Sequence, residues 1–305
     1  MTPCPDNGAH SYPSDRHRGH ALVGATRSAA EPIAGVEFCA IGEIGPTTDW
    51  SKPIAGVDIV VHLANRAHRG RIDPPAAFEP EAAASLTRQA AAAGVRRLVH
   101  MSSVRAMGEA TKPGMPFRAG DALRPGDRYG QGKLAIEHAL LAAARGSTLE
   151  LVVLRPPLVY GPGVKANFRA LIRLAGSGLP LPFAGIDNRR SLIFIDNLVG
   201  AAALACVHPA AAGRVLLACD GMDLSTPQLL RVLADGLGRP ARLFAVPDAT
   251  FGVLRLLPGL GPRVARLTLS LQVDDSAARD TLGWAPEIAT EQALLSTAAA
   301  FRRRR

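Results

Sequence analysis

The sequence predicts an α/β protein with a doubly wound parallel sheet, followed by a smaller C-terminal domain. From about residue 20 to residue 163, apolar runs of strand length alternate with alanine-rich stretches of helical periodicity. The runs are apolar throughout, which is typical of strands buried on both faces of a parallel sheet. Beyond Gly163 the pattern changes to shorter helices, short strands and many prolines. We therefore expect an atypical segment at 1–19, a sheet domain at 20–163 and a second domain at 164–305.

The strands are expected where short apolar runs stand between turn residues. The clearest is the run VDIVVHLA at residues 57–64, and the others are RLVHMS at 97–102 and LELVVL at 149–154. Shorter runs complete the set at 20–26, 36–40, 191–195 and 215–218. Parallel strands of this kind bind ligands at their carboxyl ends, so functional side chains are expected just after the runs.

Two helices are expected between these strands. Residues 81–93 have helical periodicity and are followed by Gly94. Residues 129–144 also have helical periodicity, and the helix is expected to end before Gly146. Glycine is favoured immediately after a helix because it adopts the left-handed backbone conformation without strain. The helices separate consecutive strands, as a parallel sheet requires.

Composition excludes several classes of protein. The net charge is +9, but the arginines are scattered apart from the run at 302–305, and aromatic residues make up only 5%. A base-stacking surface for nucleic acid is therefore not expected. No apolar run is long enough to span a membrane, and the polar N-terminus lacks the apolar core of a secretion signal. The four cysteines have neither disulfide-framework nor zinc-site spacing, so we expect a cytoplasmic protein without a metal.

Tyr129 and Lys133 are the first candidates for chemistry. They lie four residues apart in RYGQGKLAIEHAL, at the start of an expected helix, so both side chains share one helical face. A free tyrosine has a pKa near 10, and a nearby ammonium group stabilises the phenolate and lowers that pKa. The pair therefore suits general acid–base catalysis. An exposed i, i+4 pair without a function is the simpler alternative.

Ser103 is the third candidate because it follows a buried strand, in RLVHMSSVRAMG. Its hydroxyl would lie at the ligand-binding edge of the sheet and could hydrogen-bond a substrate oxygen. A turn serine that bonds only its own backbone is the alternative.

In this order, the motifs resemble those of the extended short-chain dehydrogenase/reductases, in particular the NAD-dependent nucleotide-sugar epimerase/dehydratase family. The resemblance rests on the strand ending in SS, the glycine of VRAMG, YxxxK, LRPPLVYGPG and the closing DDSAARDTLGWAP, and it runs from about residue 20 to the end. The details SSVRAMGE and HLANRAH are similar to UDP-glucose 4-epimerases and 4-keto-sugar reductases of polysaccharide clusters. The resemblance implies a Rossmann-like dinucleotide-binding domain at 20–163 and a mainly substrate-binding domain at 164–305. It also implies NAD or NADP as cofactor, a nucleotide-sugar substrate and a homodimer.

The resemblance also assigns roles by position. It makes Ser103 the catalytic serine, Tyr129 the acid/base, and Lys133 the lysine that binds the cofactor ribose. Further cofactor contacts are implied for Arg27, Glu43, Ala64 and Pro156, and substrate contacts for Asn167 and Arg190, with Arg190 on the diphosphate. Arg189 is nearly as good a candidate as Arg190 for that role. The motifs do not distinguish an epimerase from a dehydratase or a reductase.

The N-terminus departs from the family pattern. The family opens with a strand and a GxxGxxG turn that holds the cofactor pyrophosphate, whereas MTPCPDNGAHSYPSDRH contains one glycine and no apolar run. We expect the first strand, the glycine loop and the first helix to be missing, through a frame error or a wrong start in the gene model. The alternative function is therefore a catalytically impaired relative that binds a nucleotide sugar or a partner protein.

Overall fold

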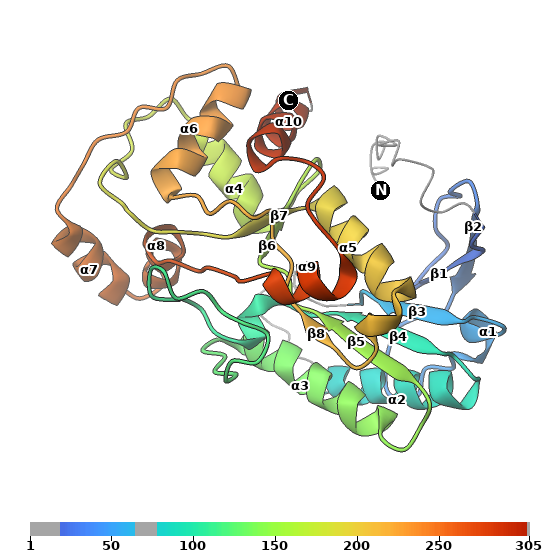
Figure 1. The fold of residues 1–305 in the computed structure, drawn as a ribbon. Helices are drawn as coiled ribbons and strands as arrows, with labels where there is room; N and C mark the ends of the chain where they lie inside the picture. The colour runs from blue at the N-terminus through green and yellow to red at the C-terminus, as the bar shows by residue number, and fades with distance from the viewer. Residues whose placement is uncertain (1–18, 65–77, 304–305) are drawn as a thin grey trace.

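The computed structural model describes residues 19–64 and 78–303, and they form an α/β sheet domain with a helical lobe above its strand ends (Figure 1). All but the last residue of the atypical segment 1–19 lies outside the described residues. The strands are β1 Leu22–Thr26, β2 Val36–Ala40, β3 Ile59–His62, β4 Arg97–Met101, β5 Glu150–Leu154, β6 Leu158–Tyr160, β7 Leu192–Phe194 and β8 Val215–Leu216. The helices are α1 Ser51–Ile54, α2 Glu79–Ala92, α3 Arg128–Ala144, α4 Ala166–Ala175, α5 Ile195–Val207, α6 Thr226–Gly236, α7 Asp248–Leu256, α8 Gly261–Thr268, α9 Ser276–Leu282 and α10 Thr290–Arg303, with short 3₁₀ helices η2 Val104–Ala106 and η3 Pro209–Ala211.

Strands β3, β4, β5 and β8 form one parallel sheet in that order, covered on both faces. Alternate residues of β4 point to opposite faces: Leu98 joins the apolar cluster beneath α2 and α3, and Val99 joins the cluster beneath α5. Helices α2 and α3 lie on one side of the sheet and α5 on the other (Figure 1). The predicted doubly wound arrangement, apolar on both faces, is therefore confirmed.

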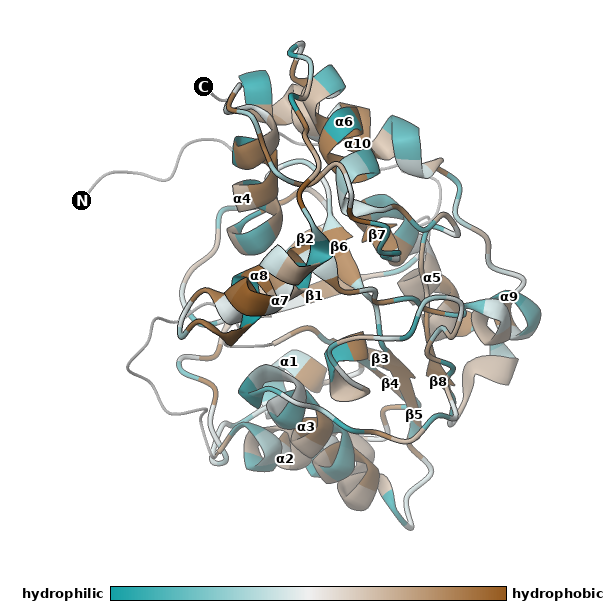
Figure 2. Cartoon of the chain, turned by 90° about the vertical axis from the view of Figure 1, so that its left-hand side faces the viewer, coloured by the Kyte–Doolittle hydropathy of each residue, from teal (hydrophilic) through white to brown (hydrophobic). Residues whose placement is uncertain are grey.

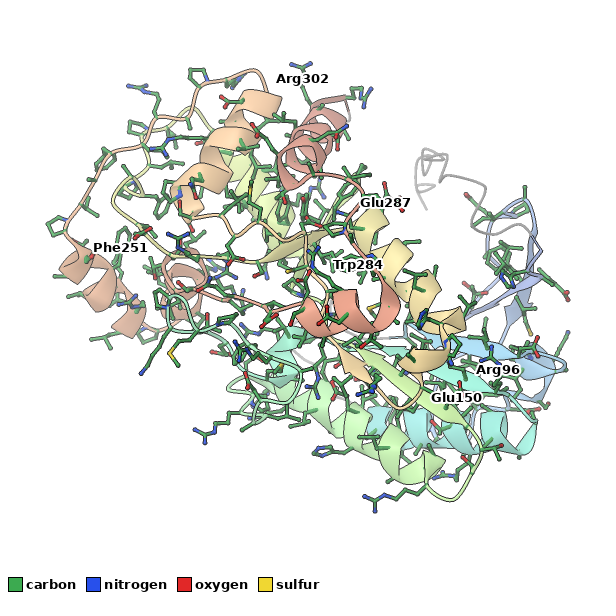
Figure 3. All side chains as sticks on the ribbon, in the orientation of Figure 1. Arg96, Glu150, Phe251, Trp284, Glu287 and Arg302 are labelled. Carbon is green, nitrogen blue, oxygen red and sulfur yellow. The ribbon has the colours of Figure 1, made fainter. Side chains whose placement is uncertain are left out.

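Polar and aromatic residues fix the layers at two further places. Glu150, at the start of β5, accepts a hydrogen bond from Arg97 Nε at 2.7 Å and pairs with the exposed Arg96 at 3.6 Å. Trp284, just after α9, is buried in the same cluster as Leu198 of α5. Both places are labelled in Figure 3. Trp284, in the closing segment DDSAARDTLGWAP, therefore packs α9 onto α5.

Strands β1 and β2 pair with each other in parallel but form a separate two-stranded sheet. Within residues 19–64 and 78–303, no strand joins β1 to β3. A cavity of about 890 Å³ lies between β1 and β3 and is lined by both strands and by α1 and α2. Apolar residues that line this cavity are exposed: Leu22 41%, Val23 43%, Val61 42% and Leu63 64%. The described part of the chain therefore lacks an inner strand, as the sequence predicts.

The helical lobe is built on the short parallel pair β6–β7. Its core is formed by α4, α6 and α10 around Phe168, Leu230 and Leu294. Strand β8 returns from this half of the chain to the main sheet. The division at residue 163 stays a prediction, since the later residues contribute to both parts. None of the helices that the structure describes has the length and apolar character needed to cross a membrane.

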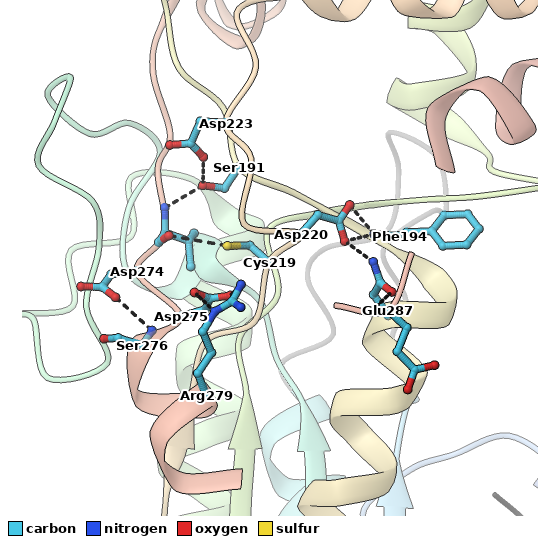
Figure 4. Close-up of polar contacts among 12 residues, drawn as sticks. Ser191, Phe194, Cys219, Asp220, Asp223, Asp274, Asp275, Ser276, Arg279 and Glu287 are labelled. Carbon is cyan, nitrogen blue, oxygen red and sulfur yellow. Dashed lines mark hydrogen bonds and ion pairs between the residues drawn. The ribbon is translucent and has the colours of Figure 1, made fainter. Parts of the chain in front are cut away.

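A buried carboxylate joins the sheet to the lobe. Asp220, after β8, accepts hydrogen bonds from the Phe194 backbone N–H at 3.0 Å, from Asn197 at 2.8 Å and from the Tyr160 hydroxyl at 2.7 Å. The contact to Phe194 is drawn in Figure 4. Burial raises the pKa of Asp220, and its hydrogen bonds oppose that rise. These bonds hold β6 and β7 against the end of β8, above the carboxyl ends of the main strands.

Candidate active site

The site lies where β4 and β5 end beside the first turn of α3. The chain leaves β4 through Ser102 and Ser103 and leaves β5 through Arg155 and Pro156. The two exits are hydrogen-bonded to each other: the Val104 N–H donates to the Pro156 carbonyl at 3.0 Å. Pro156 therefore lies next to the Ser103 turn, and its contact with the cofactor stays a prediction.

The start of α3 is fixed against the Ser103 turn. Asp127 caps the helix, and its carboxylate accepts from the Gly130 N–H at 2.7 Å. The same carboxylate pairs with the Arg105 guanidinium. Gly130 packs so closely on the Arg105 backbone that an added Cβ would lie 2.9 Å from the Arg105 carbonyl carbon and nearer still to its oxygen. Only glycine allows this approach, which brings Tyr129 to the turn that carries Ser103.

Tyr129 and Lys133 lie on the same face of α3, but Tyr129 is exposed and Lys133 is buried. The Tyr129 side chain is 39% exposed, whereas Lys133 is 4% exposed. The Lys133 ammonium donates to the Met101 carbonyl, at the last residue of β4, at 2.8 Å. Burial lowers the pKa of Lys133 to about 8, and the carboxylates of Glu79 and Glu137 oppose this shift. The geometry excludes the alternative of a pair lying wholly on the surface.

A buried ion pair lies one turn further along α3. Glu137 accepts from the Arg155 guanidinium at 3.0 and 2.5 Å and from the Ser102 hydroxyl. All three residues are at most 4% exposed. Glu137 belongs to α3, Arg155 follows β5 and Ser102 follows β4, so the network sets the position of α3 along the ends of the two strands. Glu137 is also a buried carboxylate on α3 whose charge raises the pKa of Lys133.

Ser103 caps the short helix η2 and is 8% exposed. Its hydroxyl accepts from the Arg105 N–H at 3.2 Å. This bond is the one expected of a turn serine, so the structure gives Ser103 that local role. Because a hydroxyl also donates, Ser103 keeps a proton for a substrate oxygen.

Three predicted cofactor residues line the cavity between β1 and β3. Arg27 follows β1 and pairs with Glu43 at 3.7 Å, and Ala64 follows β3. Ile136 of α3, three residues beyond Lys133, lines the same cavity. The cavity thus extends from Arg27, Glu43 and Ala64 to Ile136 on α3, whereas Tyr129 and Lys133 are not among the residues that line it.

The residues near the cavity fit the two riboses of a dinucleotide better than the pyrophosphate between them. Arg27 and Glu43 offer charge and hydrogen-bonding groups to an adenosine ribose, and Lys133 offers them to the other ribose. The helix that begins at the cavity, α2, has Glu79 in its first turn, which would repel a pyrophosphate. No glycine-rich turn lines the cavity within the part of the chain that the structure describes.

Two histidines are stacked beneath the site. His62 and His100 are register partners on β3 and β4, and their Nδ1 atoms lie 3.0 Å apart. Burial lowers the pKa of His62 to about 4, with a smaller contribution from Lys133. Burial also lowers the pKa of His100 well below its usual value, with further contributions from His62 and Lys133. Both rings are therefore neutral at pH 7.

The predicted substrate residues gather in a cationic region between the sheet and the lobe. Arg190 donates to the Leu269 carbonyl at 3.1 Å and makes no ion pair with any other described residue. Burial lowers the pKa of Arg190 to about 10, and the charges of Arg105 and Arg266 lower it further. Arg266, on α8, also donates to Asn167 Oδ1 at 3.3 Å. Arg266 thus contacts the predicted residue Asn167 and is close enough to Arg190 for its charge to act on it, and the three arginines suit an anionic ligand.

Several residues of this site have no assigned role in the sequence analysis. Glu137 follows Lys133 by four residues, so the extended spacing YxxxKxxxE could have identified it. Gly130 follows Tyr129 directly and could have been identified as a close packing position. Arg266 and the histidine pair carry no motif, because only the tertiary fold and the strand register bring them to the site.

Comparisons with known proteins identify the family of the chain. The model of the NAD dependent epimerase/dehydratase family matches residues 7–218. A UDP-glucose 4-epimerase of Vibrio cholerae is 40% identical, over 92% of this chain and 88% of the relative. A 3-diazoavenalumate denitrifying reductase of a Streptomyces species is 31% identical, over 88% of this chain and 92% of the relative. The crystal structure of UDP-glucuronic acid 4-epimerase from Bacillus cereus in complex with NAD has a TM-score of 0.70 at 19% identity, over 89% of this chain and 82% of that one.

Proposed function

The chain belongs to the NAD-dependent epimerase/dehydratase family of enzymes, and we propose from this that it is a nucleotide-sugar 4-epimerase or 4-keto-sugar reductase in which Tyr129 is the acid/base. The observation that carries the proposal is the buried ammonium of Lys133 one helical turn after Tyr129, at the ends of β4 and β5. The Vibrio cholerae relative supports the epimerase and the Streptomyces relative supports a reductase.

Tyr129 moves the proton in this mechanism. Its phenol oxygen takes the proton of a sugar hydroxyl during oxidation and returns it during reduction. To act near pH 7 the phenol pKa must fall by about three units, which corresponds to roughly 4 kcal/mol of preferential stabilisation of the phenolate. The Lys133 ammonium and the N-terminal end of α3 both favour the phenolate. NAD, when bound, supplies the hydride acceptor and donor.

The remaining residues position the reactants. Ser103 donates its hydroxyl proton to the sugar oxygen and holds that oxygen beside Tyr129. Lys133 holds the cofactor ribose, and Pro156 lies beside the Ser103 turn. Arg27, Glu43 and Ala64 hold the adenosine end along the cavity. Arg190 and Asn167, with Arg266 bonded to Asn167, bind the diphosphate of the nucleotide sugar, because an arginine can offer two parallel N–H donors to phosphate oxygens.

A product assay tests the proposal. The purified chain is incubated with NAD and UDP-glucose, and the formation of UDP-galactose is followed by proton NMR. A matched reaction with NADH and a UDP-4-keto sugar tests the reductase. Product in either reaction supports the proposal, and absence of product in both, from folded protein that binds NADH, contradicts it.

The interrupted sheet favours one other function, a nucleotide-sugar-binding protein without redox chemistry. The exposed edges of β1 and β3 and the absence of a glycine-rich turn from the described part of the cavity support it. Titration with NADH, followed by its fluorescence, separates the two functions. Saturable binding favours the enzyme, whereas binding of UDP without binding of NADH favours the second function.

A further inference from the structure

The helical hairpin formed by α7 and α8 exposes a cluster of large apolar side chains at its tip. The tip cluster consists of Val253, 63% exposed, Leu256, 82%, Leu257, 45%, and Leu260, 38%. The hairpin lies at the outer edge of the lobe (Figure 1), and hydrophobic colour gathers on it in the view from that side (Figure 2). Several neighbouring leucines that remain in water mark an interaction surface rather than ordinary scatter.

The inner face of the hairpin is packed and holds the tip in place. Phe251 of α7 and Val264 of α8 are buried with Ile186, and Phe251 stacks on Phe183 with ring centroids 6.0 Å apart. Gly261 packs against the Arg255 backbone where a Cβ would collide. The exposed leucines therefore belong to a structured turn whose inner side is already satisfied, and its outer side is left for a partner.

After Asp248, the first residue of α7, every charged residue of the hairpin is an arginine. Between Asp248 and Asp274 the sequence contains no acidic residue, and it contains Arg255, Arg263 and Arg266. Arg263 is exposed beside the tip, and Arg255 donates to the Thr268 hydroxyl at 3.2 Å. A cationic polar rim around exposed leucines is the pattern of a segment that inserts shallowly into an anionic membrane surface.

We propose that the α7–α8 hairpin docks this protein on anionic lipid membranes, with the tip cluster inserted between the headgroups and the arginines paired with lipid phosphates. A second copy of the chain fits this surface less well. In a two-fold symmetric pair the same patch packs against its copy, so the arginines of both copies would gather at one interface. An anionic membrane satisfies both the leucines and the arginines. The inference does not depend on the proposed activity.

Docking has a geometric consequence for the candidate active site. Arg266, which contacts Asn167 and acts electrostatically on Arg190, is on α8 itself. A hairpin inserted at its tip would hold the cationic region close to the membrane surface. A sugar diphosphate presented at that surface would then have a short path to the site.

Vesicle sedimentation of the full chain tests the proposal. The probes are vesicles of phosphatidylcholine alone and of phosphatidylcholine mixed with phosphatidylglycerol. We expect binding to the mixed vesicles that weakens with added salt, and little binding to phosphatidylcholine alone. The double variant Leu256→Ser/Leu257→Ser should bind at least about tenfold more weakly, and Arg263→Gln about fivefold more weakly. Leu141→Ser is the matched control, since Leu141 on α3 is 46% exposed and Leu257 is 45% exposed.

Unchanged urea midpoints in the variants show that any loss of binding is not a loss of folding. Three outcomes overturn the proposal. In the first, the chain binds neither kind of vesicle. In the second, the hairpin variants bind as well as Leu141→Ser. In the third, sedimentation equilibrium shows a dimer that Leu256→Ser/Leu257→Ser converts to a monomer, which assigns the tip cluster to a second copy.

Discussion

Gly130 offers a direct test of how the candidate site is built, through the variants Gly130→Ala and Gly132→Ala. Both glycines lie in the first turns of α3, and neither has a positive φ. In Gly132→Ala the new methyl group would meet nothing within 4 Å. In Gly130→Ala it would lie 3.0 Å from Pro125 Cβ and 2.9 Å from the Arg105 carbonyl carbon, and would collide with the carbonyl oxygen.

The two variants share one energy term and differ in another. Each gains the helix propensity of alanine over glycine, roughly 0.5–1 kcal/mol. Only Gly130→Ala forces α3 away from the Ser103 turn, by about 1 Å, and overpacking of this kind costs about 1–3 kcal/mol. The difference in the free energy of unfolding between the two variants therefore isolates the close contact. We expect Gly132→Ala to be more stable than Gly130→Ala by about 1–3 kcal/mol.

Urea unfolding followed by circular dichroism measures this difference, and turnover provides a second measurement. A shift of about 1 Å in Tyr129 is expected to lower kcat/KM by roughly a hundredfold in Gly130→Ala. Gly132→Ala should keep the wild-type value. If the two variants unfold within about 0.5 kcal/mol of each other, the described packing of α3 on the Arg105 backbone is wrong.

Three further predictions concern buried charge. Glu137→Gln should lower the free energy of unfolding by about 3–5 kcal/mol, because it leaves the buried Arg155 without a counter-charge. The control Glu81→Gln, in an ion pair of 2.7 Å that is more than half exposed, should lower it by under about 1 kcal/mol. Equal losses in the two variants would contradict a buried Glu137–Arg155 ion pair. The folded-state pKa of His62 lies below its unfolded value, so stability that is present above pH 6.5 should be lost as the pH falls to about 4, by up to about 3 kcal/mol. Urea unfolding across this pH range should show a smaller loss in His62→Gln. The control variant His138→Gln, at an exposed histidine, should show the same loss as the wild type. Arg190→Gln should raise the KM for the nucleotide sugar at least about tenfold, because one charge-assisted contact is lost, with a smaller effect on kcat. Steady-state kinetics should show no such change for Arg189→Gln, at the exposed neighbouring residue. A larger rise in KM for Arg189→Gln than for Arg190→Gln would assign the diphosphate contact to Arg189.

The sheet domain could be predicted from the sequence because each strand is a short apolar run with turn residues at its ends. The expected strand at 97–102 is β4 Arg97–Met101, and the expected helix at 81–93 is α2 Glu79–Ala92. Helix α2 begins earlier than expected because Pro80 is tolerated in a first turn. Gly94 follows the helix with φ +79°, the left-handed conformation that the prediction assumes.

The hairpin α7–α8 shows where such prediction ends. The stretch FGVLRLLPGLGPRVAR contains glycines and prolines that hide its two short helices, and nothing in it distinguishes the buried Phe251 from the exposed Leu256. The candidate site likewise contains some residues that a local motif predicts and others that only the tertiary fold brings together. Tyr129 and Lys133 share a local motif, whereas the pairing of His62 with His100 depends on strand register and the approach of Arg266 to Arg190 depends on the packing of the lobe.

The most direct test of the central claim, that Tyr129 beside the buried Lys133 is the acid/base, is the turnover of Tyr129→Phe. This variant removes one hydroxyl from a side chain that is 39% exposed, so its urea midpoint should match that of the wild type. Product formation from the nucleotide sugar that the wild-type chain converts should fall by at least about a hundredfold, while NADH still binds. A variant that folds, binds NADH and turns over at a near wild-type rate would show that the proton is carried by another group.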